Sequence, residues 1–161
     1  IRAIGAGVND VGTVPLFIEM LDLDFFLLAL RYTLGEQSAL SEELPMLQER
    51  GIGLVVGGVF SSGLYAAGPV EGARFNYRQP TREQLARVAA IMAVCARHQV
   101  PLNAAALQFP LHHPVTASVI PGAISPAEVS ANVAAMRHEI PADFWAELKH
   151  EKLIAEDAPT P

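Results

Sequence analysis

The stretch VIPGAISPAEVSAN, residues 119–132, joins the end of an apolar run to the start of a helix. Ser125 is a favourable N-cap residue, Pro126 suits the first helical position, and Glu128 at the third can complete a capping box with Ser125. The apolar residues before Pro121 are typical of a β-strand. The stretch therefore predicts a strand, a short loop and a helix whose N-terminus can face an anion.

The same order of strand and helix repeats along the chain. Apolar runs predict strands at Arg2–Val8, Asp24–Tyr32, Gly53–Val59 and Val115–Ile120. Helical spacing predicts helices at Val14–Leu21, Ser38–Arg50, Thr81–His98, Pro101–Leu111, Ser125–Arg137 and Ala142–Lys149. This alternation predicts an α/β fold with a parallel sheet, either a small open sheet or half of an eight-fold barrel.

Three segments carry further expectations. Asp24–Tyr32 is apolar almost throughout, which favours a strand buried on both faces. Gly63–Pro80 is rich in Gly and Pro and predicts a long loop, which in a compact domain is usually functional. One domain is expected over residues 1–155, followed by a disordered tail at 156–161.

The composition limits the classes of partner. The chain has 161 residues, of which 51% are hydrophobic and 17% charged, with a net charge of −6. An acidic surface without basic clusters argues against nucleic acid and anionic membranes as partners. No apolar run approaches the roughly 20 residues of a membrane-spanning helix.

The single cysteine and the first residue suggest the setting of the chain. Cys95 cannot form an internal disulfide, so a reducing, cytoplasmic location is expected. The sequence begins with Ile1 and has no signal peptide pattern. We expect residues upstream of Ile1, although a trimmed terminus would look the same.

Four segments together resemble the aldo-keto reductase family. The Ile120–Asn132 segment is similar to the family's eighth strand and the helix after it. The segments similar to its fifth, sixth and seventh strands follow in the family's order: Ile4–Asn9, Phe26–Tyr32 and Val55–Leu64. The resemblance covers roughly Arg2 to Leu153 and implies an α/β, (β/α)8 TIM barrel, of which this chain supplies the last four β/α units.

Three shorter strings are similar to one branch of that family. They are RYTL at Arg31–Leu34, GGVFSSG at Gly57–Gly63 and ALQFPLHHP at Ala106–Pro114. The branch oxidises free sugars with NAD and includes L-fucose and D-threo-aldose 1-dehydrogenases, with pyridoxal 4-dehydrogenase a close relative. The resemblance thus implies a nicotinamide-dependent oxidoreductase that acts on an aldose or aldehyde.

The resemblance places the cofactor phosphates at two loops. Phosphate groups in such barrels often lie after the seventh and eighth strands. Here those positions are Phe60, Ser61, Ser62 and Gly63, and the segment that begins at Pro121. The first loop can offer backbone N–H groups and two hydroxyls to a pyrophosphate, or it can be an ordinary Ser/Gly turn.

The segment after the eighth strand bears on the choice of cofactor. In NADP-using relatives, basic and hydroxyl side chains grip the 2′-phosphate at the positions of Gly122, Ala123 and Glu128. This chain has no cation at any of the three, and Glu128 would repel a 2′-phosphate. NAD is therefore expected in preference to NADP. Asn132 matches the position that contacts the adenine.

The nicotinamide end departs further from the family. Asn9 matches the residue that holds the carboxamide, but it can equally belong to a turn or be an N-cap. The glutamine expected on the sixth strand is replaced by Ala29, and the stacking aromatic of the seventh by Gly57.

The family's catalytic Asp, Tyr, Lys and His come from its first four β/α units, so the resemblance implies no catalytic residue here. His112 and His113 lack a third ligand at a recognisable spacing, and no metal site is expected. Cys95 lies on an apolar helix stripe and is expected in the core. Arg31 ends an apolar strand and is the candidate for a substrate contact, with an acidic neighbour as the alternative partner.

Two functions remain open from the sequence. In one, the chain is the cofactor-binding half of an NAD-dependent aldose dehydrogenase, whose partner is the missing N-terminal half of the barrel. In the other, it is a non-catalytic half-barrel that binds nucleotide or assembles with a partner half or as a homo-oligomer. A half-barrel exposes two sheet edges, which favour association.

Overall fold

The computed structural model describes all residues from Ile1 to Pro161, and four parallel strands form its sheet. The strands are β1 (Gly5–Val8), β2 (Phe25–Ala29), β3 (Gly53–Gly57) and β4 (Thr116–Ile120). The helices are α1 (Val14–Met20), α2 (Glu43–Arg50), α3 (Leu64–Ala67), α4 (Arg82–His98), α5 (Leu102–Gln108), α6 (Pro126–Arg137) and α7 (Ala142–His150). Short 3-10 helices cover Val11–Thr13 (η1) and Phe109–His112 (η2).

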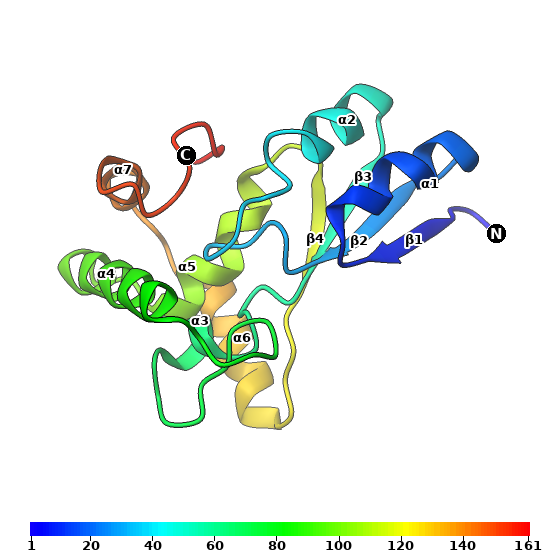
Figure 1. Ribbon diagram of the computed structural model, residues 1–161. Helices are drawn as coiled ribbons and strands as arrows, with labels where there is room; N and C mark the ends of the chain where they lie inside the picture. The colour runs from blue at the N-terminus through cyan, green and yellow to red at the C-terminus, as the bar shows by residue number, and fades with distance from the viewer.

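The strands lie in chain order, β1-β2-β3-β4, so each connection leads to the adjacent strand. Phe26 pairs with Ala6 on one side and with Leu54 on the other. The register shifts between Leu54 and Val55 where β3 meets β4. Because all strands run in one direction, the loops after β3 and β4 emerge at the same end of the sheet, as Figure 1 shows.

Only one face of the sheet is fully covered. Phe26 and Leu28 of β2 are buried, and the α1 residue Phe17 packs edge-on against Phe26 at 6.4 Å between ring centroids. Phe25 and Leu27, which alternate with them, stay partly exposed. The expectation of a strand buried on both faces is therefore wrong for this chain, since no element covers the second face.

A row of contacting aromatic rings joins the C-terminal helix to the segment that follows β2. The ring centroids of Tyr32 and Phe109 lie 5.3 Å apart, and those of Phe109 and Trp145 lie 6.2 Å apart. Trp145 also meets Phe144 at 4.9 Å. All four rings are buried, so α7 packs as part of the single core and Trp145 anchors it.

The helix signals in the sequence are mostly confirmed. Thr81 and Gln84 form the predicted capping box of α4. Ser125 Oγ accepts the hydrogen bond from the Glu128 backbone N–H, as expected of an N-cap. The Glu128 carboxylate, however, accepts from Ile124 N–H at 2.9 Å rather than from Ser125. The predicted capping box is thus displaced by one residue, because the side chain reaches past the N-cap into the loop.

The long segment Gly63–Pro80 is more ordered than the expected loop. It contains α3 and then a tight two-residue hairpin turn, in which Phe75 and Arg78 exchange two backbone hydrogen bonds of 2.9 and 3.0 Å. Asn76 and Tyr77 between them both have positive φ, which fits a type I′ turn.

The last residues have a defined place in the structure. Ala158 is fully buried and its N–H donates to Ala155 at 3.2 Å. Within the tail expected at 156–161, Ala158 belongs to the core together with Leu153 and Ile154 just before it. No helix has the length and apolar character needed to cross a membrane.

Candidate functional site

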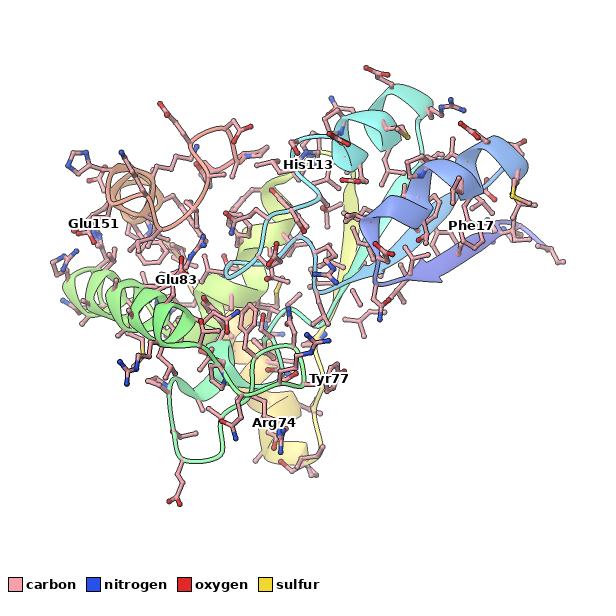
Figure 2. The ribbon with its side chains drawn as sticks, viewed as in Figure 1. Phe17, Arg74, Tyr77, Glu83, His113 and Glu151 are labelled. Atoms are coloured by element: carbon pink, nitrogen blue, oxygen red, sulfur yellow. The ribbon has the colours of Figure 1, made fainter.

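The candidate site lies at the end of the sheet where the strands finish. The β3–α4 and β4–α6 segments meet there, and Figure 2 shows Arg74 and Tyr77 projecting from the first of them near the strand ends. Ligands of parallel α/β folds bind at the carboxyl ends of the strands. The predicted cofactor residues lie on loops or at the start of α6, except Asn132, which lies in the middle of that helix.

The loop after β3 is a tightly wound turn. Ser61, Ser62 and Gly63 all have positive φ, and Ser61 N–H and Gly63 N–H donate to Gly58 and Phe60 carbonyls at 2.8 and 3.0 Å. These two N–H groups are already used within the turn. The loop therefore offers a ligand fewer backbone donors than the sequence suggested.

The side chains of this loop divide between core and surface. Phe60 and Ser61 are buried, and Ser61 Oγ has no hydrogen-bond partner. Ser62 is exposed, and its Oγ accepts from Tyr77 N–H at 2.8 Å. Its own hydroxyl hydrogen is not used in that bond, so Ser62 and the exposed Gly63 form the surface that a phosphate could meet.

Gly58 is required where β3 turns into this loop. Its φ is +67°, and a Cβ placed there would lie 2.4 Å from Leu30 Cδ2. Only glycine fits both the backbone conformation and the close approach of the β2 end. The turn is thereby held against Leu30.

The loop after β4 is exposed and tied to α6. Gly122, Ala123 and Ile124 are exposed, and Pro121 is partly so. Asn132 Nδ2 donates to the Gly122 carbonyl oxygen at 3.4 Å, a long bond. The loop thus lies across the N-terminus of α6, where the partial positive charge of the helix favours an anion.

Glu128 puts a negative charge at the same place. Its carboxylate is exposed and bonds to Ile124 N–H, so it lies beside the loop and not along the helix. No Lys or Arg forms an ion pair with it. This end of the site is therefore unfavourable for an additional phosphate group.

A mostly polar cavity of about 490 Å³ lies at the ends of β1 and β2. Asn9 and Arg31 line it from the strand ends, and Asn76 and Tyr77 line it from the hairpin. Arg31 Nε–H donates to the Asn9 carbonyl oxygen at 2.7 Å, whereas Asn76 Oδ1 is buried without a partner. Asp10, and not Asn9, caps η1, which leaves the Asn9 side chain outside the N-cap role.

The two residues that replace the family's expected glutamine and aromatic at the nicotinamide end are neighbours in the sheet. Ala29 of β2 pairs with Gly57 of β3. A Cβ on Gly57 would lie 3.4 Å from Leu27 Cδ2 and 3.6 Å from the Ala29 Cβ. A side chain at Gly57 would therefore begin in contact with both Leu27 and Ala29. The sequence alone could not reveal this pairing.

The buried tyrosines and the cysteine form no hydrogen bond with either lysine. Burial raises the pKa of the Tyr32 and Tyr65 hydroxyls, and the Tyr32 hydroxyl also lacks a hydrogen-bond partner. Burial likewise raises the pKa of the Cys95 thiol to about 11, in agreement with its expected place in the core. The lysines lie on or just after α7, on the far side of the molecule from β1 and α1 (Figure 1).

His112 and His113 lie inside the fold. His113 is buried with its ring edge-on to Tyr32, and His112 meets Trp145 in the same way at 5.0 Å. Burial lowers the pKa of both imidazoles. The pair therefore belongs to the aromatic core, because each imidazole packs edge-on against a buried aromatic ring.

Comparison with known proteins agrees with this architecture. Residues 1–151 match the sequence profile of the Aldo/keto reductase family. The chain is 40% identical over 155 residues to pyridoxal 4-dehydrogenase of Microbacterium luteolum, covering 96% of this chain and 45% of that protein. It is 41% identical over 162 residues to D-threo-aldose 1-dehydrogenase of a Pseudomonas species, covering 100% of this chain and 48% of that protein.

A solved structure gives the same fold. The holo form of an aldo-keto reductase from Bacillus halodurans superposes with a TM-score of 0.74 at 24% identity, over 95% of this chain and 50% of that one. The chain thus spans about half the length of the relatives it matches. The prediction of four β/α units forming half of a (β/α)8 barrel is confirmed.

Proposed function

Because the chain belongs to the aldo/keto reductase family, we propose that it is the cofactor-binding half of an NAD-dependent oxidoreductase that oxidises an aldose at C1. The relative named D-threo-aldose 1-dehydrogenase supports this substrate class, since the match to it extends over the whole of the present chain. The observation that carries the proposal is the pair of loops after β3 and β4, which leave adjacent strands at the same end of the sheet, the second one leading into the N-terminus of α6.

The residues of these loops fit a dinucleotide. The N-terminus of α6 and the exposed Gly122 can receive a phosphate, and Ser62 with Gly63 can receive the other from across the site. Asn132 would orient the adenine end once it releases its long bond to Gly122. When bound, the nicotinamide supplies the hydride acceptor.

The preference for NAD rests on Glu128. Its carboxylate stands beside the α6 N-terminus without a cation nearby, so it favours a ribose hydroxyl and disfavours a 2′-phosphate. In the full-length enzyme we expect kcat/KM to be higher with NAD than with NADP. Equal values, or a higher value with NADP, would contradict the preference.

A charge reversal tests the residue directly. Glu128→Arg should weaken NADH binding a few-fold and strengthen NADPH binding by about tenfold, as measured by quenching of protein fluorescence. Glu49→Arg on α2 makes the same change of charge away from both loops and should leave the ratio of the two affinities unchanged. If both variants shift the ratio equally, the effect is one of net charge and Glu128 has no specific role.

Arg31 is proposed to contact a substrate hydroxyl. Its Nε–H is fixed on Asn9, while its remaining N–H groups are free to face the cavity that both residues line. Arg31→Gln should raise KM for the sugar more than it lowers kcat, with Arg31→Lys intermediate. An unchanged KM in both variants would remove Arg31 from the substrate site.

A second function, assembly without catalysis, is favoured by the open edges of the sheet. The groove between β4 and α6 has a volume of about 470 Å³ and is mainly apolar, and Ile124 and Val129 beside it are 95% and 53% exposed. At the other edge, Leu16 and Met20 of α1 are 57% and 80% exposed. Apolar surfaces of this kind on a parallel sheet call for a cover, either the missing N-terminal half or a second copy.

Self-association of the isolated chain tests this reading. Size-exclusion chromatography with light scattering should show dimers or larger species, and Val129→Lys with Val133→Lys should reduce them. Val70→Lys, at a similarly exposed valine outside the groove, is the control. A compact monomer of 17.2 kDa for the unmodified chain would contradict the assembly.

A further inference from the structure

A second, basic pocket lies away from the strand ends, between α4, α7 and the C-terminal segment. We define the basic pocket by the basic residues that line it, Arg87, Lys149, His150 and Lys152. Gln37 and Glu156 complete its polar wall, and its volume is about 620 Å³. Both lysines of the whole chain lie here, although the net charge is −6.

None of these basic residues forms an ion pair within the protein. The three ion pairs of the structure all involve Arg97 or His98. Glu156 is the one carboxylate in the wall, and it lies within ion-pair distance of none of the cations. Positive charges that converge without a counter-ion repel one another and attract an anion from solution.

Arg87 is held in place for such a role. Its Nε–H and one Nη2–H donate to the Leu153 carbonyl oxygen at 3.1 and 2.7 Å. Since a guanidinium carries five N–H donors, three stay available. The two hydrogen bonds to Leu153 also fix the turn that carries Lys152. The φ of Lys152 is +56°, in the left-handed region.

The walls of the pocket are tied together from three parts of the chain. Arg97 on α4 pairs with Glu147 and Glu151 on α7, and Figure 2 shows Glu151 on the side of α7 that faces α4. Gln37, from the segment after β2, accepts the Ala155 N–H at 3.0 Å. The basic pocket is thus preformed and would need little ordering on binding.

The dipole of α7 explains only part of this arrangement. Lys149 stands in the last turn of α7, where a cation stabilises a helix C-terminus. Arg87 comes from another helix and directs its charge into the same space. Stabilisation of the α7 C-terminus does not require Arg87, so the dipole alone does not account for the basic pocket.

We propose that the basic pocket binds a small phosphate-bearing molecule. Two lysines and a guanidinium with three free donors suit the several acceptor oxygens and the double charge of a phosphate group. The volume falls within the usual range of small-molecule sites, and most of the lining residues are polar or charged. The proposal is independent of the dinucleotide site at the strand ends.

Calorimetric titration of the full-length protein at low ionic strength tests the proposal. Inorganic pyrophosphate and glycerol phosphate should both bind, which covers inorganic and organic sources, and citrate should bind more weakly. Lys149→Gln with Lys152→Gln should lower the affinity by at least about tenfold. Arg2→Gln with Arg50→Gln removes the same charge outside the pocket and should leave the affinity unchanged.

The outcomes separate this site from the dinucleotide site. The lysine variant should keep its affinity for NADH while it loses pyrophosphate. No heat of binding from either phosphate, an equal loss in the two variants, or citrate binding as tightly as pyrophosphate would overturn the proposal. Loss of NADH and pyrophosphate together would also overturn it, because the phosphates would then occupy one shared site.

Discussion

Gln37 Oε1 accepts a hydrogen bond from the backbone N–H of Ala155, 3.0 Å away, although the two residues are 118 positions apart. The same side chain donates through Nε2 to the carbonyl oxygens of Thr33 and Leu34 at 2.8 and 2.9 Å. One amide thus joins the segment after β2 to the C-terminal segment. The aromatic contacts of α7 complete this junction.

Removal of that amide should loosen the C-terminal segment. Gln37→Ala loses three partly buried hydrogen bonds and should lower the free energy of unfolding by about 2 kcal/mol. Amide hydrogen exchange at Ala155 should accelerate in the same variant. Gln37→Glu keeps the acceptor and loses the donors, so its Ala155 amide should stay protected. Equal exchange in the two variants would show that the bond to Ala155 is unimportant.

Gly58 and Gly51 form a matched pair for the turn after β3. Both have a φ of +67°, but a Cβ at Gly58 would meet Leu30 at 2.4 Å, while a Cβ at Gly51 would have no atom within 4 Å. Gly51→Ala should cost about 1 kcal/mol through backbone strain alone. Gly58→Ala should cost more, about 3 kcal/mol, because Leu30 must also move. Urea unfolding of both variants gives the comparison, and equal losses would exclude a role for the Leu30 contact.

Acid should weaken the docking of α7 on α4 through Glu147. The hydrogen bond with His98 and then the one from Arg97 hold the pKa of Glu147 below its usual 4.5. A carboxylate with a lowered pKa adds stability above the unfolded value and loses it as the pH falls through the folded value. Stability should therefore drop below about pH 4.5, and Glu147→Gln should flatten that part of the profile.

The control for this profile is Glu49→Gln, which removes a carboxylate that forms no ion pair. The measurement is the urea midpoint of unfolding, followed from about pH 3 to about pH 7. A slope in the Glu147→Gln variant as steep as that of the original chain would show that the cluster does not control acid stability.

His113 should add a second step at higher pH. Burial lowers its pKa from 6.5, so the unfolded chain takes up the proton first and stability falls as the pH drops below that value. His113→Phe keeps a ring against Tyr32 and should lessen this loss between about pH 6.5 and 5. His150→Gln, at an exposed position, should leave it unchanged. Identical midpoints for His113→Phe and the original chain across this window would contradict the assignment.

Local signals in the sequence determined much of this protein. The capping residues Thr81 and Ser125 act over a few bonds, and they marked the starts of α4 and α6 correctly. The strand positions followed from short apolar runs, and the order of motifs at Ile120–Asn132 and elsewhere indicated the family and the half-barrel. These features depend on neighbours in the chain, so they are legible without a structure.

Other features depended on the tertiary structure, because they join residues far apart in the chain. The pairing of Ala29 with Gly57, the burial of His113 against Tyr32 and the bond from Ala155 to Gln37 have no local pattern. The basic pocket arises in the same way, since Arg87 and Lys149 meet only when α7 packs on α4. The burial of apolar surface brings these segments together, and that process sets their charges and donors side by side.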